Sequence, residues 1–404
     1  MDRARTDSTE RLPVLKLLVL AGANFVAVSS EFLPTAIVPS VATSLDVTEA
    51  QVGLLITVFA AMVVIFTTPL VALTRNLPRK PLLLAALCVF AISNIICAIA
   101  PNYPVLVAAR VLSGMVHGLF WAVSTPYIAR MVHRDHLAKA ISIAATGGTL
   151  AFVLGVPVGA AIDQAVGWRW SFVVMAALVF AFAALAWRFL PAVQHHITLA
   201  TGEIPLPVRR ERAIRMLYVF LGAVLVLITT HNVYGTYQVP WMLQVGHVDP
   251  AMVSLLLALN GGAGFVTLAI VAAWGDRHPR ALVRIALVVI ALAMVGLALF
   301  GRGGWGVLVF TLFWATAVPM VPQVLQVRMM RAASMRLRDV SGALVPVAFN
   351  IAIGGGALIG GLLFDGVGVA VLPWVLAGGA IATLVVLIST ERWAFGDLGL
   401  RRQR

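Results

Sequence analysis

The stretch Asn24-Phe25-Val26-Ala27-Val28-Ser29-Ser30-Glu31-Phe32-Leu33-Pro34-Thr35 lies inside an apolar run from Val14 to Val38. Such a run is longer than the roughly 20 residues that a helix needs to cross a bilayer. On a 3.6-residue period Asn24, Glu31 and Thr35 share one face, and the remaining surface of the helix is apolar. A carboxylate at that depth is costly and is usually functional. We therefore expect this polar face to lie against protein or water rather than lipid.

The whole chain is as apolar as this stretch. Of its 404 residues, 61% are hydrophobic and only 11% are charged, and the mean hydropathy is +0.98. These values exclude a soluble globular protein and indicate a polytopic membrane protein. The apolar runs predict about twelve spans of roughly 20 residues each: 14–39, 51–73, 81–100, 105–129, 140–163, 169–190, 214–239, 251–274, 282–300, 305–327, 340–364 and 369–390.

The charges are distributed unevenly between the two sides of these spans. A net charge of +13 and a pI near 11.1 are also typical of nucleic-acid-binding proteins, so the positions of the charges decide between the two classes. All but three of the 29 basic residues fall on one side; Arg169 and Arg302 lie on the other, and Arg110 lies inside a span. Five acids face outward: Asp46, Glu49, Asp163, Asp249 and Asp365. This asymmetry predicts a multi-pass protein of the cytoplasmic (inner) membrane with both termini cytoplasmic, basic residues against anionic lipid, and no nucleic-acid partner.

An internal repeat divides the chain into two halves. Pro78-Arg79 after the second span matches Pro279-Arg280 after the eighth at an offset of 201 residues, and a second pair of matches has an offset of 202. The second pair joins Gly159 and Asp163 with Gly361 and Asp365. We therefore expect an all-α membrane protein of two pseudo-symmetric six-helix bundles, 1–190 and 214–404, joined by a cytoplasmic linker at 191–213.

Several short motifs stand in a fixed order around these spans: Arg75-Asn76-Leu77-Pro78-Arg79-Lys80, Arg110-Val111-Leu112-Ser113-Gly114, Gly155-Val156-Pro157-Val158-Gly159, Gly167-Trp168-Arg169-Trp170 and Gly275-Asp276-Arg277-His278-Pro279-Arg280. Over nearly the whole chain, this order resembles the major facilitator superfamily, in its twelve-span branch of drug and metabolite:proton antiporters, which includes efflux proteins of the sugar, purine and chloramphenicol type. The first loop keeps the cations of the family's Gly-x-x-x-Asp-Arg-x-Gly-Arg-Lys loop but not its Asp or Gly.

The resemblance implies an exporter that works by alternating access. The Gly-Pro-rich motif of span five is similar to the antiporter motif, and the loop acid is linked in the family to latching one gate state. It also implies a set of gating residues: Arg79, Lys80, Gly155, Pro157, Gly159, Asp276 and Arg280.

Glu31 is the first candidate for proton coupling, because a carboxylate in low dielectric can gain or lose a proton as water access switches sides. Arg110, as a cation inside a span, needs a partner, which is either Glu31 or a set of backbone carbonyls. His117 follows Arg110 on the same helix face and titrates near neutral pH when unperturbed. Each also has a structural alternative: a permanently paired acid, a structural cation, and a packed histidine.

The remaining polar and aromatic side chains inside spans predict a substrate cavity. Such side chains also bridge helices without touching a ligand, so packing is the alternative for each. Only one cation and one anion lie at depth, which favours a neutral or amphipathic organic substrate. The predicted cavity residues are Asn24, Thr35, Trp121, His231, Tyr234, Gln238, Asn260, Trp314, Gln323 and Asn350.

The sequence contains no Gly-rich nucleotide loop ending in Lys-Ser or Lys-Thr, and no hydrolase or metal constellation. We therefore expect no enzyme activity, no cofactor and no use of ATP, with a proton gradient as the energy source. The expected partners are a small-molecule substrate, protons and the lipid bilayer, and the expected state is a monomer, since one chain holds both halves. Two alternatives stay open: a proton-coupled or facilitative importer of a sugar-like metabolite, and a transport-inactive membrane sensor.

Overall fold

The computed structural model describes residues 13–74, 77–132, 137–192, 214–275, 277–332 and 335–395. Every regular element in these residues is helical. In chain order they are α1 (Val14–Ala36), α2 (Val38–Leu45), α3 (Glu49–Leu73), α4 (Arg79–Ile99), α5 (Tyr103–Met131), α6 (Leu137–Leu150), η2 (Ala151–Gly155), α7 (Val156–Val166), α8 (Trp168–Phe189), α9 (Ile214–Gly235), α10 (Gln238–Gln244), α11 (Pro250–Trp274), α12 (Pro279–Phe300), α13 (Gly304–Ala317), α14 (Met320–Ala332), α15 (Met335–Gly366), η4 (Val369–Val371) and α16 (Leu372–Phe395). They include twelve stretches that are long and apolar enough to cross a membrane. The predicted all-α membrane fold is confirmed.

Two predicted spans contain breaks that composition does not reveal. The first, predicted as 14–39, ends as α1 at Ala36, and α2 begins at Val38 after a turn in which the Ile37 amide bonds to the Pro34 carbonyl. The tenth, predicted as 305–327, is divided into α13 and α14 just before and after Pro319. Pro39 at the start of α2 and Pro319 before α14 explain the two breaks, because proline has no amide hydrogen and also disfavours a helical residue before it.

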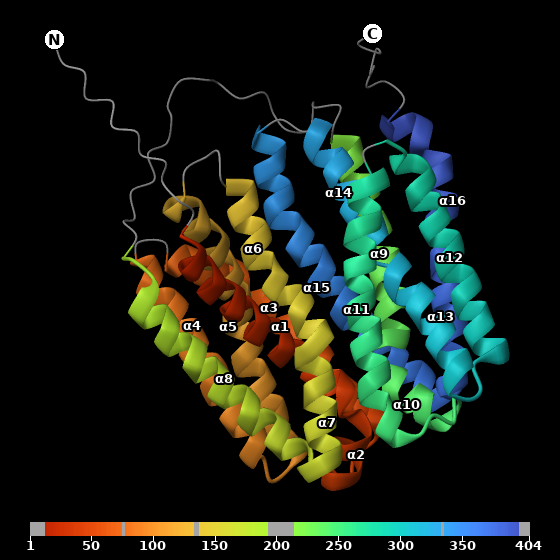
Figure 1. Ribbon diagram of the computed structural model, residues 1–404, viewed down its shortest axis with the longest axis horizontal. Helices are drawn as coiled ribbons and strands as arrows, with labels where there is room; N and C mark the ends of the chain where they lie inside the picture. The colour runs from red at the N-terminus through yellow and green to blue at the C-terminus, as the bar shows by residue number, and fades with distance from the viewer. Residues whose placement is uncertain are drawn as a thin grey trace.

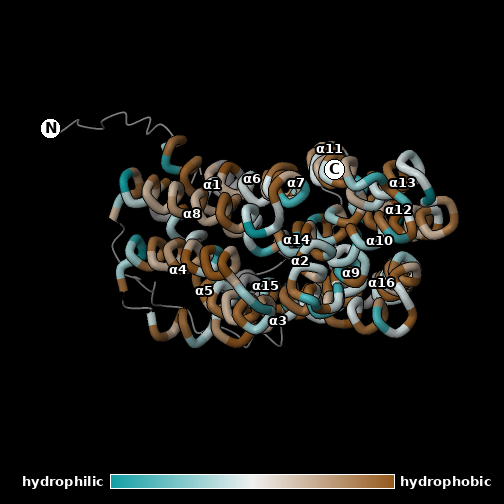
Figure 2. The backbone as a smooth tube through the Cα atoms, turned by 90° about the horizontal axis from the view of Figure 1, so that it is seen from below, coloured by the Kyte–Doolittle hydropathy of each residue, from teal (hydrophilic) through white to brown (hydrophobic). Residues whose placement is uncertain are grey.

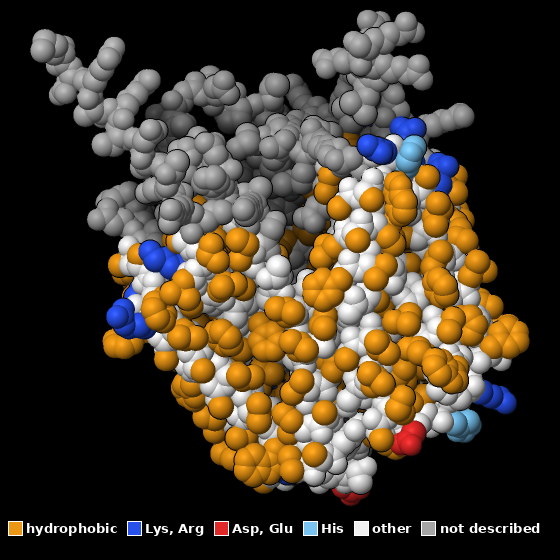
Figure 3. Space-filling model, viewed as in Figure 1, with side chains coloured by type: hydrophobic (Ala, Val, Ile, Leu, Met, Phe, Trp, Pro, Cys, Tyr) orange, Lys and Arg blue, Asp and Glu red, His pale blue; other side chains and the backbone are white. Residues whose placement is uncertain are grey.

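The helices run between two faces of different charge. We call one of them the basic face: Arg188 lies in the last turn of α8, and Arg280 lies in the first turn of α12. At the opposite, acidic face lie Asp46, Asp163 and Asp249, near the ends or starts of α2, α7 and α11. Figure 3 shows apolar side chains over the height between the two faces. This surface suits a membrane protein whose helices are surrounded by lipid.

The helices of the two sequence halves lie on different sides of the molecule. In Figure 1, α4 and α8 lie at one side, and α12, α13 and α16 lie at the other. Helix α15 packs on α3 as well as on α9, and α7 with η2 packs on α11, so these helices join the two groups. Figure 2 shows the same arrangement from below. Residues 193–213 lie outside the described residues, so the exact domain limits stay a prediction.

The internal repeat extends into the backbone conformation. Gly167, before α8, has φ 97° and ψ 155°, and Gly368, before η4, has φ 101° and ψ 159°. These two glycines are 201 residues apart, the same offset as the predicted repeat. A positive φ of this kind is open to glycine but strained for residues with a Cβ. The same turn therefore begins the last span of each half.

Several contacts join the halves at the acidic face. The Tyr237 hydroxyl lies 3.0 Å from the Ala357 carbonyl oxygen and 3.4 Å from that of Ala50. Gln164 Nε2 donates to the Pro250 carbonyl at 2.7 Å. Gln244 Nε2 donates to the Glu49 carboxylate at 3.1 Å. These bonds hold α3 and α7 of one half against α10, α11 and α15 of the other.

Candidate functional site

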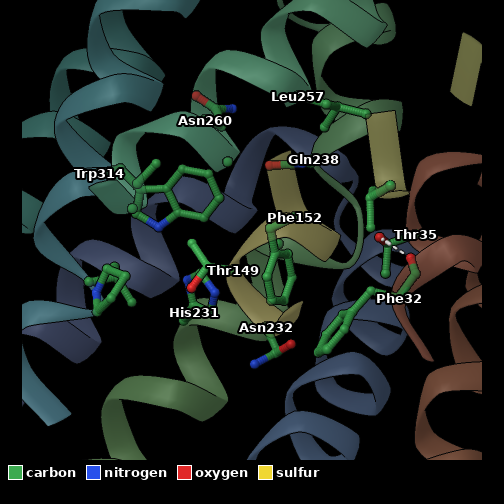
Figure 4. Close-up of a pocket in the computed structure, with 18 of the residues that line it drawn as sticks. Phe32, Thr35, Thr149, Phe152, His231, Asn232, Gln238, Leu257, Asn260 and Trp314 are labelled. Carbon is green, nitrogen blue, oxygen red and sulfur yellow. Dashed lines mark hydrogen bonds between the residues drawn. The ribbon is translucent and has the colours of Figure 1, made fainter. Parts of the chain in front are cut away.

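A cavity of about 430 Å³ lies between the two halves. Figure 4 shows ten of its lining residues by name. Both sequence halves supply its walls, because α1, α6, η2 and α7 contribute from one half and α9, α10, α11, α13 and α14 from the other. The lining residues are Phe32, Thr35, Ala145, Gly148, Thr149, Phe152, Val156, His231, Asn232, Gly235, Thr236, Gln238, Leu257, Asn260, Gly261, Gly264, Leu268, Trp314, Ala315, Val318, Pro319 and Gln323. This set contains no Asp, Glu, Lys or Arg.

The N-terminal half contributes an aromatic pair to the cavity. The rings of Phe32 on α1 and Phe152 on η2 have centroids 5.0 Å apart. Phe152 lies in a π-helical turn, in which the Val156 amide bonds to the Ala151 carbonyl five residues back. Pro157 follows this turn and has no amide hydrogen with which to continue a regular α-helical ladder. Turns of this kind often occur at functional sites.

The C-terminal half contributes a second aromatic pair. The rings of His231 on α9 and Trp314 on α13 have centroids 5.2 Å apart. Behind them, Tyr234 packs its ring edge-on against Trp314 at 5.1 Å. Figure 4 shows Trp314 and His231 on one side of the cavity, and Phe152 and Phe32 farther to the other side. Each half thus contributes one pair of rings to the same space.

Several polar atoms of the lining have no hydrogen-bond partner within the described residues. They are Oδ1 and Nδ2 of Asn260, Oε1 of Gln238, Nε1 of Trp314, Nδ1 of His231 and Oγ1 of Thr236. Buried polar groups in proteins are almost always bonded, so such groups need an explanation. Because these atoms belong to residues that line one cavity, the cavity is the candidate site for a polar ligand.

A separate group of ionisable side chains lies outside the cavity, between α1 and α5. We call Glu31, Arg110, His117 and Trp121 the Glu31 cluster. The exposed fractions of Glu31, Arg110 and His117 are 6%, 1% and 4%. Neighbours of Glu31 on α1, Phe32 and Thr35, line the cavity, but Glu31 itself does not. The fold therefore brings the predicted proton-coupling residues together, and they lie next to the residues that line the cavity without lining it themselves.

Arg110 binds the backbone of α1 rather than the carboxylate of Glu31. Its two terminal nitrogens each donate at 2.8 Å, one to the Ser30 carbonyl and one to the Glu31 carbonyl. The Ser30 carbonyl would normally accept from the amide four residues later, but that residue is Pro34. Arg110 thus supplies the donor that the proline lacks. The backbone-carbonyl alternative is therefore the arrangement observed.

The guanidinium of Arg110 also lies over an aromatic ring. Its Cζ is 4.4 Å from the ring centroid of Phe59 on α3. A cation over the face of an aromatic ring is stabilised by the ring's quadrupole. Arg110 therefore connects three helices, α1, α3 and α5, through carbonyl oxygens and a ring rather than through a carboxylate.

His117 joins Glu31 to Trp121. The indole Nε1–H of Trp121 donates to His117 Nε2 at 2.8 Å, which makes Nε2 the acceptor nitrogen of the imidazole. Glu31 Oε2 lies 3.4 Å from the same Nε2. A carboxylate oxygen and an imidazole lone pair repel each other, so this contact favours a proton on one of the two groups. The rings of Phe59 and Phe90 lie edge-on to His117 at 5.0 Å and 5.8 Å.

The predicted cavity residues fall into two groups. Those that line the cavity are Thr35, His231, Gln238, Asn260, Trp314 and Gln323. Asn24 lies outside the lining because its amide donates to the Ala144 carbonyl at 2.8 Å and bridges α1 to α6. Trp121 is directed to His117, and Tyr234 is fully buried behind Trp314. Asn350 bonds to the Pro346 carbonyl one turn back on α15.

Other lining residues were not among the predicted ones. Phe32 and Phe152 carry no polar signal in the sequence, and the π-turn that holds Phe152 changes the helical periodicity by one residue. Asn232 lies on α9, Thr236 directly follows the end of that helix, and Thr149 lies on α6. Polarity within the predicted spans was therefore a signal that could have identified them.

The structure describes the positions of most of the predicted gating residues, whose gating role stays a prediction. Lys80 Nζ donates to the Leu190 carbonyl at 2.6 Å, and Arg79 and Arg280 begin α4 and α12 near the basic face. Gly155 and Gly159 lie against α1, where a Cβ would come within 1.9 Å of Ser29 Oγ and 2.2 Å of Leu33 Cδ1. Pro157 is buried at the start of α7. Asp276 lies outside the described residues.

The chain is similar in sequence and in fold to known transporters. A family model described as Major Facilitator Superfamily matches residues 20–345. The crystal structure of a bacterial homolog to the human lysosomal transporter Spinster, inward-facing and occupied, has a TM-score of 0.71 and 16% identity, with 95% of each chain covered. Its inward-facing, unoccupied form has a TM-score of 0.70 and 16% identity over 95% of this chain and 96% of that one.

A human protein has the same fold. The crystal structure of the human organic anion transporter MFSD10 (TETRAN) has a TM-score of 0.62 and 17% identity, with 93% of this chain and 98% of that chain covered. At these identities the likeness is one of fold, whereas the family match spans most of the chain. The twelve apolar helices, the repeat and this match together show that the chain is a multi-pass membrane transporter of the Major Facilitator Superfamily.

Proposed function

We propose that the protein exports a small, uncharged organic molecule in exchange for protons. The observation that carries this proposal is the contact of 3.4 Å between Glu31 Oε2 and His117 Nε2, buried inside a membrane protein. Ionisable residues in such a setting usually serve ion movement, because burying them has a free-energy cost that structure alone seldom requires. Glu31 is the proton carrier in this proposal, and His117 is its proton-sharing partner.

The position of the Glu31 cluster supports coupling to the substrate. Glu31 and the two lining residues Phe32 and Thr35 lie on the same turn or adjacent turns of α1. A change in the proton state of the Glu31 carboxylate alters its contact with His117, and α1 transmits this change to the cavity wall. Coupling of this kind requires that proton and substrate bind one element with different strengths in its two arrangements.

The contacts between the halves support alternating access. The bonds of Tyr237, Gln164 and Gln244 hold the halves together at the acidic face. In this proposal the described arrangement is one of two states, with the cavity reached from the basic face. In the other state these bonds break and the acidic face opens, as expected when two halves rock around a central site.

The cavity favours an uncharged substrate. MFSD10 is an organic anion transporter by its title, but the cavity lining described here contains neither Lys nor Arg to neutralise an anion. It also contains no Asp or Glu for a cation. A charged substrate would therefore enter a low-dielectric site without a counter-charge, at a large desolvation cost.

The test is a transport assay in proteoliposomes under an imposed pH gradient, with proton release followed as a panel of uncharged organic compounds is added. We expect a transported compound to release protons in the native protein, and Glu31→Gln to abolish this release because an amide does not carry the proton. Glu31→Asp keeps a carboxylate and should retain part of the activity. Normal gradient-driven transport by correctly inserted Glu31→Gln protein would contradict the proposal.

A second acidic residue provides the matched control. Glu49 on α3 lies at the acidic face, and its carboxylate accepts from Gln244. Glu49→Gln makes the same chemical change outside the Glu31 cluster and keeps an acceptor oxygen for Gln244. It should therefore retain proton-coupled transport. Equal loss in both variants would indicate a general effect of carboxylate removal rather than a role for Glu31.

A further inference from the structure

We propose that the cavity recognises a flat ring compound in which an N–H group stands next to a C=O group, as in a lactam or cyclic imide. Asn260 is the residue that forms hydrogen bonds with this N–H and C=O edge, and Gln238 and Trp314 lie beside it. This inference rests on the proposed function in one respect, since it takes the cavity to be the substrate site. It adds the chemical class of the substrate and the residues that select it.

Asn260 carries the argument because it is buried and unpaired. Its exposed fraction is 9%, and neither Oδ1 nor Nδ2 has a hydrogen-bond partner within the described residues. A carboxamide with both atoms free presents one acceptor and one donor in the same plane. The complementary group is a planar edge with a donor next to an acceptor, which a lactam provides in a single pair of bonds.

Two neighbouring lining residues add one acceptor and one donor. Gln238 Oε1 and Trp314 Nε1 also have no partner within the described residues. Figure 4 shows Asn260, Gln238 and Trp314 around the same region of the cavity. They come from three helices, α11, α10 and α13, so they are brought together by the fold and not by local sequence. A second polar group on the ring compound is therefore matched as well.

The aromatic pairs account for the flat ring. Phe32 and Phe152 line the cavity from one half, and His231 and Trp314 line it from the other. Ring faces and edges favour another aromatic system in offset or edge-on contact. A flat ligand held at its edge by Asn260 would make these contacts with its faces and its far edge.

A sugar is the main rival, since sugars also bind near Trp and amide side chains. Sugar hydroxyls are numerous donors, and the strongest acceptors for them are carboxylates, which the lining does not contain. The lining also includes many apolar side chains, such as Leu257, Leu268 and Val318. These contacts favour a ligand with a small polar edge and a larger apolar body.

The first experiment compares three probes by equilibrium dialysis against the purified full chain in lipid nanodiscs, without any gradient. Carbostyril is a flat bicyclic lactam, N-methylcarbostyril lacks only the N–H, and glucose is the polyol. We expect carbostyril to bind saturably and at least ~10-fold more tightly than its N-methyl form, since the methyl group leaves Asn260 unpaired. Equal binding of the two lactams, tighter binding of glucose, or no saturable carbostyril binding would each overturn the inference.

Matched variants test whether Asn260 forms the hydrogen bonds with the lactam. Asn260→Leu should lower carbostyril affinity at least ~10-fold and remove the preference over the N-methyl form. Its unfolding temperature should be equal to or above that of the native protein, because no hydrogen bond within the described residues is lost. Asn350→Leu makes the same change outside the cavity and should bind both lactams as the native protein does. A preference that survives Asn260→Leu would overturn the inference.

Two further variants keep the inference separate from the proposed function. Trp314→Phe keeps a ring but removes the indole donor, so it should weaken carbostyril binding. This variant tests the site independently of whether Asn260→Leu folds. Unchanged carbostyril affinity in Trp314→Phe would count against the assigned site. Glu31→Gln should bind carbostyril normally while losing proton-coupled transport. Proton-coupled transport of other compounds with no lactam binding would refute the substrate class alone.

Discussion

The two halves of the chain differ most at positions that the repeat makes equivalent. At the offset of 201 residues, Asn232 on α9 corresponds to Glu31 on α1. Glu31 lies with His117 and Arg110 behind the cavity wall, whereas Asn232 lines the cavity and bonds to the Ile228 carbonyl at 2.9 Å. Among the described residues, the buried charged side chains Glu31 and Arg110 both belong to the N-terminal half, whereas Asn260 of the C-terminal half is neutral. In the proposed function, the N-terminal half would therefore carry the proton, and the C-terminal half would supply the unpaired amides that bind the substrate.

The largest expected effect comes from moving the carboxylate between the halves. Glu31→Asn should abolish gradient-driven transport, and adding Asn232→Glu should not restore it. The new carboxylate would be on α9, whereas His117 and Arg110 are on α5. The measurement is substrate-linked proton release in proteoliposomes, with surface delivery checked for each variant. Restored transport in the double variant would show that the halves are interchangeable in this respect.

The second prediction concerns the structural role of Arg110. Arg110→Leu removes the side-chain donor from the Ser30 and Glu31 carbonyls and should cost about 1–3 kcal/mol of stability for each buried carbonyl left unpaired. In a Pro34→Ala background the cost should be smaller, since the introduced alanine supplies a backbone amide hydrogen for the Ser30 carbonyl. Thermal unfolding of the four proteins in detergent gives the coupling energy. Equal costs in both backgrounds would show that Arg110 does not stabilise the protein by replacing the amide hydrogen that Pro34 lacks.

The third prediction concerns the place where the halves touch beside the cavity. Gly261 on α11 lies so close to η2 that a Cβ would be 2.2 Å from the Phe152 carbonyl oxygen. Gly261→Ala should therefore destabilise this arrangement by about 1–3 kcal/mol, as overpacking does. Gly262→Ala is the control, because nothing lies within 4 Å of its Cβ. Spin-label distances between α7 and α11 should lengthen in the first variant and not in the second.

The smallest effect is expected at the acidic face. Tyr237→Phe removes the hydroxyl that bridges the Ala357 and Ala50 carbonyls and keeps the buried ring. The closed arrangement should lose about 0.5–1.5 kcal/mol, the net value of one hydrogen bond. Spin-label distances across the acidic face would report a shift toward the open state. An unchanged distribution would mean that the ring, and not the hydroxyl, holds the halves together here.

The spans were predictable because a helix in lipid must be both long and apolar. The twelve observed spans agree with the predicted ones to within a few residues, and α1 is the most buried of them, with 83% of an 18-residue stretch buried inside the protein. The polar face through Asn24 and Glu31 is directed to protein, as expected. The breaks near Pro39 and Pro319 were harder to foresee, because prolines also occur inside continuous helices, as Pro34 does in α1 and Pro69 does in α3.

The site was predictable only in part, since polarity identifies a buried group but not what it contacts. Asn24 and Asn260 are both span amides, yet Asn24 bridges two helices and Asn260 is unpaired in the cavity. The sequence left open two partners for Arg110, and only the fold decides between them. Phe32 and Phe152 were missed because apolar rings are equally suited to lipid, packing and ligand.

The π-turn at 151–155 has a consequence for how this span changes in evolution. A π-turn holds one residue more than the hydrogen-bonding pattern of an α-helix requires. Removing one residue from it would restore a regular helix and rotate Val156–Val166 relative to the preceding α6 by roughly 100°. Relatives that pack this span differently should therefore show a single-residue gap here when aligned. The turn would then be the trace of an insertion that a membrane helix absorbed without breaking.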